Sequence, residues 1–438
     1  MTVALAPASH GLWRDTAIMA PATQPLQRQM EVDIAVVGAG FTGLSTALHL
    51  AEAGSVSVAV LEAHEIGFGA SGRNAGMVNA GAWIEPDELP KRLGAEYGGR
   101  LLRVLGDGPD LVYALIARYR IACDAHQNGN LHCAIGQKGL ANITERARQW
   151  ARHGVAVQLL DATQTARLVG TTAYAGSLLD PRTGTIQPLS YVRGLAQAAI
   201  GLGAQVFTQS PLIEAQRVGG QWHLSTANGG MLKARQVVVA TNTQQIQGAD
   251  AWPQLQADLL RMPYFNVATQ PLPAHLRERL LPQGRGAWDT AAVLSSFRMD
   301  ARGRLVYGSV GAIGRQGPTG KDAHVQWVRR SMRQLFPDLH GVGIDYAWHG
   351  WIDATDNHLP RLHQPAPQVW ALSGYNGRGI GPGTIFGREL ARMLLGQIRP
   401  EELPLPISHA VKPIRFKAAK ERFYLDASRL AHAVTRRV

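Results

Sequence analysis

The sequence predicts an α/β fold in which two domains interleave, and three observations support this prediction. A strand, a glycine-rich turn, a helix and a second strand follow one another near the start of the chain. Strand-like segments with turn signals occupy its middle, and a strand, a glycine cluster and a helix lie near its end. The 438 residues exceed one ordinary domain, and 45% apolar against 17% charged residues fit a globular protein with a large core.

The N-terminal unit has the pattern of a buried parallel strand followed by a helix. Residues 1–31 are predicted to be a mostly irregular lead-in. Residues 32–37 are apolar apart from Asp33, as expected of a strand buried on both faces. Residues 43–53 then change to helical spacing, and residues 57–61 form a second short apolar run. The segment therefore predicts a βαβ unit.

The turn of this unit carries the pattern G-x-G-x-x-G, and an acidic residue ends the next strand. Glycines let the backbone approach a pyrophosphate, whose charge the helix N-terminus favours. An acidic side chain at the position of Glu62 accepts hydrogen bonds from a ribose 2′-hydroxyl, which disfavours a phosphorylated ribose. The unit predicts a dinucleotide site formed by Gly38, Gly40, Phe41, Thr42, Gly43, Glu62 and Ala63.

Two further clusters of small residues lie far apart in the chain. The first glycine cluster, residues 69–76, indicates either a backbone lying against a flat ligand or a flexible surface loop. The second glycine cluster, residues 374–381, separates a predicted strand at 369–373 from a predicted helix at 384–395, with Pro382 near the helix start. The predicted ligand contacts are Ala70, Ser71, Gly72, Arg73, Asn74, Ala75 and Gly76 in the first cluster, and Gly374, Asn376, Gly377, Arg378, Gly379 and Ile380 in the second.

The middle of the chain is rich in short β-type runs separated by turn residues. A turn at residues 300–303 is predicted to join two of these runs as a hairpin, and a helix is predicted at residues 323–336. The predicted strands are residues 206–207, 212–215, 222–226, 236–240, 264–269, 292–298 and 305–310.

The chain resembles the D-amino-acid oxidase superfamily of FAD enzymes in three segments, VDIAVVGAGFTGLSTALHLAEAG, LEAHEIGFGASGRNAGMVNAG and LSGYNGRGIGPGTIFGRELARMLLG. That superfamily includes glycine and sarcosine oxidases and γ-glutamylputrescine oxidase. The resemblance extends over nearly the whole chain. Within the superfamily, bacterial L-pipecolate oxidases are most similar, through NAGMVNAGAWIEPDE, GAWDTAAVLSSFRMDARGRLVYGSVG and AWHGWIDATDNHLPRL.

The resemblance implies a Rossmann-like FAD-binding domain of the glutathione-reductase type, and an interleaved α+β substrate domain built on a mostly antiparallel sheet. The expected FAD-binding domain consists of residues 32–88, 150–245 and 340–410. The expected substrate domain consists of residues 89–149 and 246–339. Residues 1–31 are the lead-in, and residues 411–438 are expected to form a basic amphipathic helix.

The resemblance also implies the cofactor and the reaction. Family members with covalent flavin use a His or Cys near the two clusters, whereas here Arg73 and Asn74 occupy the first cluster and no Cys follows Cys133, so FAD is expected to be non-covalent. The expected activity is oxidation of a secondary amine or amino acid to an imine, with hydride transfer to flavin N5. L-Pipecolate, giving Δ1-piperideine-6-carboxylate, is the preferred substrate. The alternatives are a γ-glutamylputrescine-like or other amine, or a non-oxidase flavoprotein of cofactor assembly or tRNA modification.

The substrate contacts are less defined by pattern. Glycine oxidases place a carboxylate-binding Arg two residues after a glycine, where this chain has Ile352 after Gly350. Arg298 is the first candidate to replace that Arg, and Arg378 the second, because a guanidinium binds a carboxylate bidentately. The alternatives are a solvent-exposed strand end for Arg298 and a loop brace for Arg378. Further candidates, each with core packing as its alternative, are Tyr264 and Tyr375 beside the substrate, Trp348 as an apolar wall and His349 as a base.

The net charge of +12 is concentrated at the end of the chain. Residues 411–438 hold eight Lys or Arg against two acidic residues, which is half of the net charge, so nucleic-acid binding is not predicted. Phe423, Ala427 and Leu430 follow helical spacing beside Arg422 and Arg429. This helix can pack on the body of the protein, on a second subunit or on an anionic membrane surface. Membrane contact would favour a quinone over oxygen as the electron acceptor.

The start of the chain and its cysteines complete the predictions. Residues 1–30 lack the basic-then-apolar layout of a signal peptide, and no apolar run reaches the length of a bilayer, which favours a cytoplasmic location, with contact at the inner membrane face as an extension. Cys123 and Cys133 are expected to pack as small apolar residues. Their ten-residue spacing suits no common metal site, and no bound metal is predicted.

Overall fold

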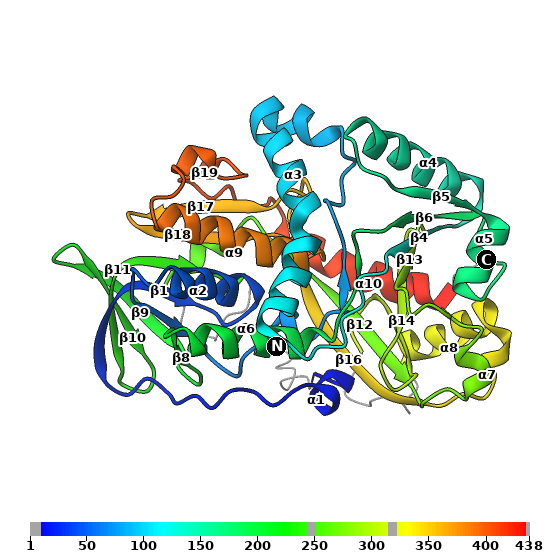
Figure 1. Cartoon of the computed structure of the whole chain (residues 1–438), viewed down its shortest axis with the longest axis horizontal. Coiled ribbons are helices and arrows are strands. Elements are labelled where there is room, and N and C mark those ends of the chain that lie inside the picture. The colour runs from blue at the N-terminus through cyan, green and yellow to red at the C-terminus, as the bar shows by residue number, and fades with distance from the viewer. Residues whose placement is uncertain (1–9, 243–250, 314–321, 435–438) are drawn as a thin grey trace.

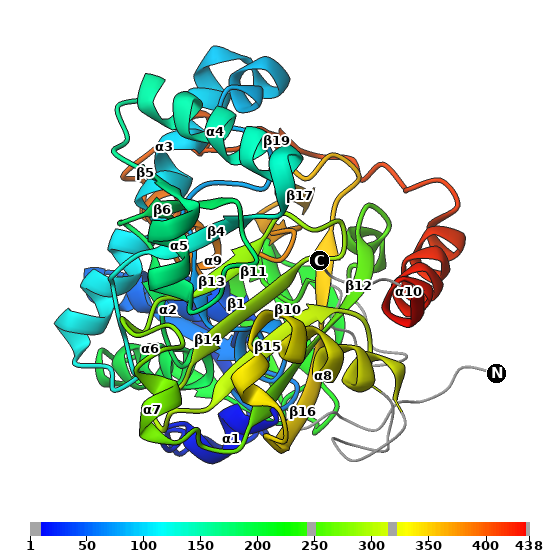
Figure 2. The same cartoon turned by 90° about the vertical axis from the view of Figure 1, so that its right-hand side faces the viewer.

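The computed structural model describes residues 10–242, 251–313 and 322–434, which form two main β-sheets lying side by side (Figure 1). The first sheet has nine strands and the second has eight. A small antiparallel pair, β3 (Met77–Val78) and β7 (Gly184–Thr185), is separate from both. Figure 2 looks from the side of the second sheet, so that this sheet lies in front of the first. The α/β architecture with two sheets is the predicted one.

The nine-stranded sheet contains the predicted βαβ unit. Its strands are β1 (Gln29–Val37), β2 (Val58–Leu61), β8 (Gln205–Phe207), β9 (Leu212–Val218), β10 (Gln221–Thr226), β11 (Met231–Val239), β17 (Arg361–Ala366), β18 (Val369–Ser373) and β19 (Ile407–Ser408). Strands β8, β2, β1, β11 and β18 are parallel neighbours. Their buried residues are almost all apolar, which is the composition expected of a sheet covered on both faces.

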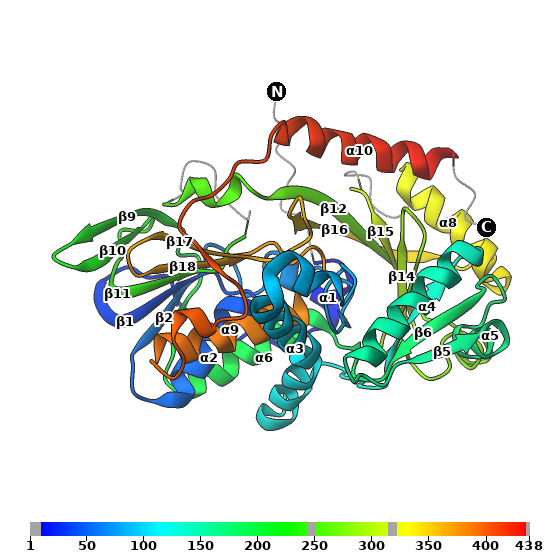
Figure 3. The same cartoon turned by 90° about the horizontal axis from the view of Figure 1, so that it is seen from above.

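Helices cover one face of this sheet (Figure 3). They are α2 (Phe41–Ala53), α6 (Pro188–Gly201) and α9 (Ile380–Leu394), and α2 packs against the other two. The long helix α3 (Glu88–Tyr119) packs on α9 and is kinked at Gly94, which has a φ of 78°. The helix predicted at residues 384–395 therefore begins four residues earlier, within the second glycine cluster.

The eight-stranded sheet has the order β16-β12-β15-β14-β13-β4-β6-β5 and is antiparallel except where β13 meets β4. The predicted hairpin is confirmed as β14 and β15. The strands are β4 (Asn130–Ala134), β5 (Gln158–Asp161), β6 (Gly176–Asp180), β12 (Leu260–Thr269), β13 (Ala287–Asp289), β14 (Ser295–Met299), β15 (Leu305–Val310) and β16 (Ile344–Ala354). Its helices are α4 (Gly136–Arg152), α5 (Ala162–Val169), α7 (Ala274–Arg277) and α8 (Ala323–Leu335).

The sheet pairing corrects the predicted domain bounds at two places. Strands β5 and β6 fall in residues 150–245, and β16 falls in residues 340–410, yet all three pair in the second sheet. The ranges expected for the nucleotide-binding domain are therefore too wide there. A strand's own residues report its burial but not its partner, so the sequence pattern could not assign these strands to a sheet.

The basic C-terminal helix α10 (Lys417–Val434) packs on the body of the protein, against α8 and β12 (Figure 3). Its contact face is not the apolar stripe that the sequence suggests, because Phe423 and Leu430 are 67% and 64% exposed. His432 is buried instead, and its Nδ1 lies 2.6 Å from Nδ1 of His324 in α8. Burial lowers the pKa of His432 to about 3, so the pair is uncharged at neutral pH.

The described part of the lead-in, from residue 10 onward, is partly helical. It contains the short helix α1 (Leu12–Thr16), whose Trp13 is buried, and then runs along the first sheet to β1. Cys123 and Cys133 are both buried, as expected. Among the described helices, none combines the length and the apolar composition needed to cross a bilayer.

Candidate active site

The predicted dinucleotide turn lies between β1 and α2 and is tightly packed. Gly38 has a φ of +106°, and its N–H donates to the carbonyl of Leu61 in β2 (2.8 Å). A Cβ on Gly43 would lie 2.0 Å from the Gly38 carbonyl oxygen, and one on Gly40 would lie 2.9 Å from Ser71 Oγ. Only glycine fits at these positions, and α2 begins directly after the turn. The geometry fits a pyrophosphate held against the backbone at a helix N-terminus.

Glu62 follows β2 beside this turn. Its Oε2 accepts from the Ala39 N–H (2.8 Å) and its Oε1 from the His64 N–H (2.9 Å), so two backbone donors fix the carboxylate. Burial raises the pKa of Glu62, and the backbone donors, including that of Ala63, act in the opposite direction. The carboxylate is thus positioned to accept further hydrogen bonds from ribose hydroxyls, as the sequence predicts.

Replacing this carboxylate gives a test of the predicted ribose contact. We expect Glu62→Ala to weaken FAD binding by about 10- to 100-fold, because a hydrogen bond to a charged group contributes about 1.5–3 kcal/mol. The measurement is fluorescence titration of the apoprotein with FAD. Glu65→Ala is the matched control, since Glu65 lies in the same loop but is 46% exposed. An unchanged dissociation constant in Glu62→Ala would exclude the contact.

The first glycine cluster is an ordered turn, held by its own side chains. Ser71 Oγ accepts from the Phe41 N–H of α2 (3.1 Å), which ties the cluster to the dinucleotide turn. Asn74 Nδ2 donates to the carbonyls of Ala70 (3.0 Å) and Ser71 (2.9 Å), and Asn74 Oδ1 accepts from the Gly76 N–H (2.8 Å). Gly72 and Arg73 are buried. These contacts do not fit a flexible surface loop.

The second glycine cluster connects β18 to α9. Asn376 has a φ of 54°; its N–H donates to Asp353 O (3.2 Å), and its Oδ1 accepts from the Thr355 N–H (2.9 Å). Gly379 is the N-cap residue of α9, and Ile380 begins the helix. The positive end of the helix dipole therefore lies at this cluster, where it stabilises negative charge on a bound ligand.

Strand β16 brings the two clusters together. A Cβ on Gly350 would lie 3.2 Å from Arg73 of the first cluster, and a Cβ on Gly377 of the second cluster would lie 3.2 Å from Ile352. Two residues of one strand, Gly350 and Ile352, thus contact both clusters. The two glycine clusters, far apart in the chain, therefore lie close together at this strand.

Two of the predicted aromatic substrate residues lie near this junction. Trp348 donates its Nε1–H to the Arg73 carbonyl (3.0 Å). Tyr264 pairs with Gly350 across the β12–β16 ladder, and its hydroxyl lies 2.7 Å from Ser296 Oγ. Tyr375 stands apart, because its hydroxyl contacts Thr42 Oγ1 of α2 (2.6 Å) and braces the second cluster against that helix.

His349 lies on the opposite face of β16. Successive strand side chains point to opposite faces, so His349 faces away from Trp348 and Gly350. It pairs with Phe265, whose ring lies 5.3 Å from that of His324 in α8. Burial and the nearby Arg73 lower the pKa of His349. This imidazole thus lies on the other face of β16 from Trp348 and Gly350, and its role as a base stays a prediction.

Arg298 in β14 is buried rather than exposed at a strand end, with 2% of its surface accessible. Its guanidinium donates to the carbonyls of Gly76 (3.0 Å), Ile186 and Met299 (3.2 Å). It also lies 5.6 Å from the ring of Trp13. Burial lowers the pKa of Arg298 to about 10, so it remains charged at neutral pH. These contacts brace the end of the first cluster.

Arg378, within the second cluster, is also buried. Its Nη1 donates to the Ala80 carbonyl (2.9 Å), and its guanidinium lies 4.7 Å and 5.2 Å from the rings of Trp83 and Trp288. Burial lowers the pKa of Arg378 to about 9, below its ordinary value but still above neutral pH. The Arg378 guanidinium therefore lies between the second glycine cluster and the second sheet.

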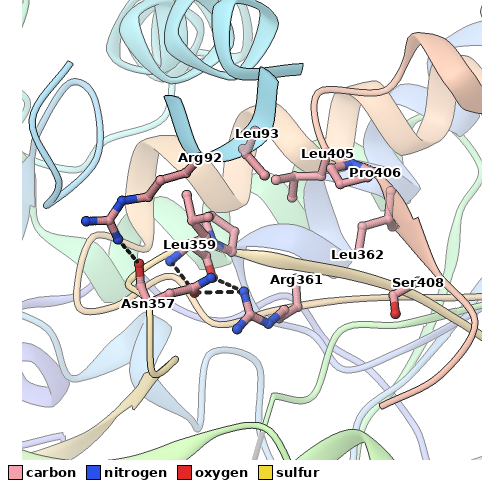
Figure 4. A pocket seen from close by; sticks show the side chains of 10 residues that line it. Arg92, Leu93, Asn357, Leu359, Arg361, Leu362, Leu405, Pro406 and Ser408 are labelled. Carbon is pink, nitrogen blue, oxygen red and sulfur yellow. Dashed lines mark hydrogen bonds between the residues drawn. The ribbon is translucent and has the colours of Figure 1, made fainter. Parts of the chain in front are cut away.

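An open groove of about 540 Å³ lies elsewhere (Figure 4). Arg92 and Arg361 contribute charged groups to it, and Arg92 donates to the Asn357 carbonyl (3.2 Å). Its walls come from the kinked start of α3, from β17 and from the segment before β19. No residue that lines it belongs to the dinucleotide turn or to either glycine cluster, so we do not assign the reaction to this groove.

Several residues at the junction were not singled out from the sequence. They lie in segments whose partners are distant in the chain, and an isolated Trp, His or Arg carries no positional signal of its own. Trp83 and Trp288 lie within segments that resemble L-pipecolate oxidases, and this resemblance was the available hint. The set comprises Trp13, Trp83, His132, Arg146, Asn266 and Trp288.

A nucleotide-binding βαβ unit, joined to a second sheet where two glycine clusters meet, defines the class of flavin-dependent oxidoreductases. The residues fit FAD: the glycine turn leaves no room for a Cβ, a helix N-terminus faces the pyrophosphate position, and a fixed carboxylate lies where the ribose belongs. FAD bound here would have its adenosine end at Glu62 and its flavin end at the two clusters.

Comparison with known proteins agrees with this class. The sequence model of the family described as FAD dependent oxidoreductase matches residues 33–393. The chain is 34% identical to γ-glutamylputrescine oxidoreductase of Escherichia coli strain K12 and 32% identical to the probable oxidoreductase OrdL of Haemophilus influenzae, with 85% of each chain covered in both cases. The structure of glycine oxidase from Geobacillus kaustophilus superposes with a TM-score of 0.69 at 20% identity, covering 84% of this chain and 96% of the other.

The chain belongs to the FAD dependent oxidoreductase family. The predicted resemblance to the D-amino-acid oxidase superfamily is confirmed, and the protein is an FAD-dependent amine or amino-acid oxidoreductase. Non-covalent attachment of FAD is consistent with this family and with glycine clusters that contain neither His nor Cys. The closer likeness to L-pipecolate oxidase stays a prediction.

Proposed function

We propose that this enzyme oxidises a cyclic or secondary amino acid to an imine, with L-pipecolate as the preferred substrate and Δ1-piperideine-6-carboxylate as the product. The observation that carries the proposal is the meeting of both glycine clusters at β16, where Ile352 provides partly exposed apolar surface and the buried Trp348 fixes the Arg73 carbonyl. The three sequence segments that resemble L-pipecolate oxidases support the choice of substrate.

The chain's contribution to the reaction is orientation and exclusion of water. Bound FAD would supply the two-electron acceptor for hydride from C6 of the L-pipecolate ring, the carbon beside nitrogen that does not bear the carboxylate, and loss of the nitrogen-bound proton would leave the C6=N bond of the product. Trp348 and Tyr264 would confine the ring of the substrate from the second sheet. The N-terminus of α9 would stabilise the negative charge that develops on the ligand beside it.

A second candidate substrate is a γ-glutamylputrescine-like amine. The 34% identical relative carries that name, and Ile352 stands where glycine oxidases have an arginine for an α-carboxylate. From another class, a flavoprotein without oxidase activity, engaged in assembly or tRNA modification, would share the scaffold. Each alternative predicts a response of the flavin to the same set of amines that differs from the response expected of an L-pipecolate oxidase.

An anaerobic screen separates these readings. We expect L-pipecolate to bleach the flavin absorbance of the purified yellow protein. We expect γ-glutamylputrescine and sarcosine to bleach it more slowly. Faster bleaching by γ-glutamylputrescine would overturn the choice of L-pipecolate. Absence of bleaching by every amine would favour the class without oxidase activity. Dithionite, which reduces any accessible flavin, is the positive control.

The electron acceptor and the location belong to the same proposal. Oxygen and a quinone are both acceptors to be tested, by admitting air or a soluble quinone to the bleached enzyme. Contact with an anionic membrane is supported by exposed Phe416, Phe423 and Leu430 along α10, beside basic residues. A cytoplasmic location, at the inner membrane face if that contact forms, and association into oligomers both remain predictions.

A further inference from the structure

A small, partly open cavity lies beside the second glycine cluster, between that cluster and the second sheet. Its volume is about 40 Å³, and Arg378, Arg146 of α4 and His132 of β4 contribute to its lining. The ring of Trp288 stacks on His132, with centroids 3.5 Å apart and planes 12° apart. Trp83 meets Trp288 edge to face at 5.3 Å. The lining therefore combines the stacked Trp288 and His132 rings, two guanidinium groups and the polar side chains of Asn130, Thr183 and Asp180, while Trp83 packs behind Trp288.

The charges around this cavity do not balance. Arg378 is 8% exposed and Arg146 is 7% exposed. Arg146 forms an ion pair with Glu85 (3.3 Å), whereas Arg378 has no ion pair within 4.0 Å among residues 10–242, 251–313 and 322–434. The Asp180 carboxylate, which also lines the cavity, is bound by both Nε (2.9 Å) and Nη2 (2.6 Å) of Arg182. One buried positive charge thus lacks a counter-charge in direct contact.

Hydrogen-bonding groups at the cavity are also unsatisfied. Within the described part of the chain, Arg378 Nε, Arg146 Nε and His132 Nδ1 are buried and have no hydrogen-bond partner. Burial and the two arginines hold the pKa of His132 well below its usual range, so its ring is neutral. Leaving a buried donor unpaired costs about 1–3 kcal/mol, and more for a charged group. All three atoms belong to residues that line this one cavity, which favours a site completed by a ligand.

We propose that this cavity is the subsite for the carboxylate of the amine substrate, with Arg378 as its main binding residue and Arg146 as the second. The inference rests on the proposed function, because it takes the ligand to be the substrate. Arg378 belongs to the second glycine cluster, so a carboxylate bound to it is attached to a molecule lying at the flavin end of the site. The cavity volume of about 40 Å³ exceeds the roughly 10–15 Å³ that one water needs in the same measure, so a group the size of a carboxylate can enter.

The aromatic walls explain how the site selects its ligand. The cation–π contacts with Trp83 and Trp288 hold the Arg378 guanidinium in a fixed plane without using its hydrogen-bond donors. A neutral group in the same place would leave that cation uncompensated. The site is therefore expected to reject amines without an acidic group. This role replaces that of the arginine which glycine oxidases have at the position of Ile352.

The test compares two ligands that differ only in charge and cannot be oxidised at a ring nitrogen: cyclohexanecarboxylate and cyclohexanecarboxamide. Each is titrated into the FAD-loaded enzyme, and binding is followed by the flavin absorbance spectrum. We expect the wild-type enzyme to prefer the carboxylate, and Arg378→Gln to reduce that preference by about 100-fold, as is typical for a buried charge that loses its partner. Arg146→Gln should reduce it less. Arg92→Gln, in the open groove of Figure 4, is the matched control and should leave it unchanged.

An unchanged preference in Arg378→Gln, or equal binding of the two ligands by the wild-type enzyme, would overturn the inference. If Arg378→Gln does not retain FAD, Leu178→Glu tests the same cavity from its opposite lining by placing an internal carboxylate there. That variant should lose binding of cyclohexanecarboxylate, and retained binding would equally contradict the subsite.

Failure of the subsite and failure of the proposed function are distinguishable. If no amine bleaches the flavin while the carboxylate preference depends on Arg378, the subsite stands and the reaction is wrong. If L-pipecolate bleaches the flavin and the preference does not depend on Arg378, the reaction stands and the carboxylate binds elsewhere.

Discussion

Gly43→Ala is expected to yield a protein that is purified without its yellow colour. The added methyl group would lie 2.0 Å from the Gly38 carbonyl oxygen and 3.1 Å from Val36 Cγ1. This overlap can be removed only if α2 or the dinucleotide turn moves, because the nearest atom belongs to the backbone. Overpacking of this kind costs up to about 3 kcal/mol, which corresponds to roughly 100-fold weaker FAD binding when the bound form bears the whole cost.

The measurement is the ratio of flavin to protein absorbance after purification, followed by titration of the apoprotein with FAD. Gly201→Ala is the matched control: this glycine ends α6, has no atom within 4 Å of the added Cβ and does not have a positive φ. The control should retain full flavin content. Full flavin content in Gly43→Ala as well would show that the close helix packing does not determine FAD binding.

Arg298→Ala is expected to destabilise the protein by about 3–4 kcal/mol. The substitution removes a fully buried side chain and leaves the carbonyls of Gly76 and Ile186 without their donor. Because Gly76 ends the first glycine cluster, flavin retention should fall as well. Denaturant unfolding of the FAD-loaded protein gives the loss of stability, and Arg304→Ala provides a comparison, since its guanidinium pairs with Asp300 in the same hairpin (3.4 Å).

The same variant also tests the other role predicted for Arg298. If the guanidinium binds the substrate carboxylate, the Michaelis constant for L-pipecolate rises steeply while that for piperidine, which lacks the carboxylate, does not. If it is a brace, the two constants change together. A selective rise with unchanged stability would return Arg298 to the substrate site and weaken the case for Arg378.

The nucleotide-binding part of the site could be predicted from the sequence because it is local. Gly38, Gly43 and Glu62 lie within one βαβ unit, and their spacing follows from the close approach of a turn, a helix and a strand. The two glycine clusters could be recognised as ligand contacts, although nothing in their composition showed which strand would join them. That strand is β16, and its own residues do not show which sheet it enters.

The substrate side could not be predicted to the same extent. Arg298 and Arg378 were both proposed for the carboxylate, and the sequence offered no means of knowing that three backbone carbonyls surround the first and aromatic rings the second. Similarly, the spacing of Phe423 and Leu430 indicates a helix but not which side of it is buried. Burial depends on distant partners, which a periodic pattern does not identify.

The strand order of the first sheet has a consequence for how the protein is made. Gln29 pairs with Met231, and Val237 pairs with Val369, so the central strands come from widely separated parts of the chain. Contacts at such separation slow folding, and residues 237–239 of β11 stay unpaired along one edge until the ribosome has synthesised β18. The second glycine cluster emerges later still, so the cofactor is captured only after translation of nearly the whole polypeptide. Soluble yield in a foreign host should therefore depend on chaperone capacity and on riboflavin supply at that late step.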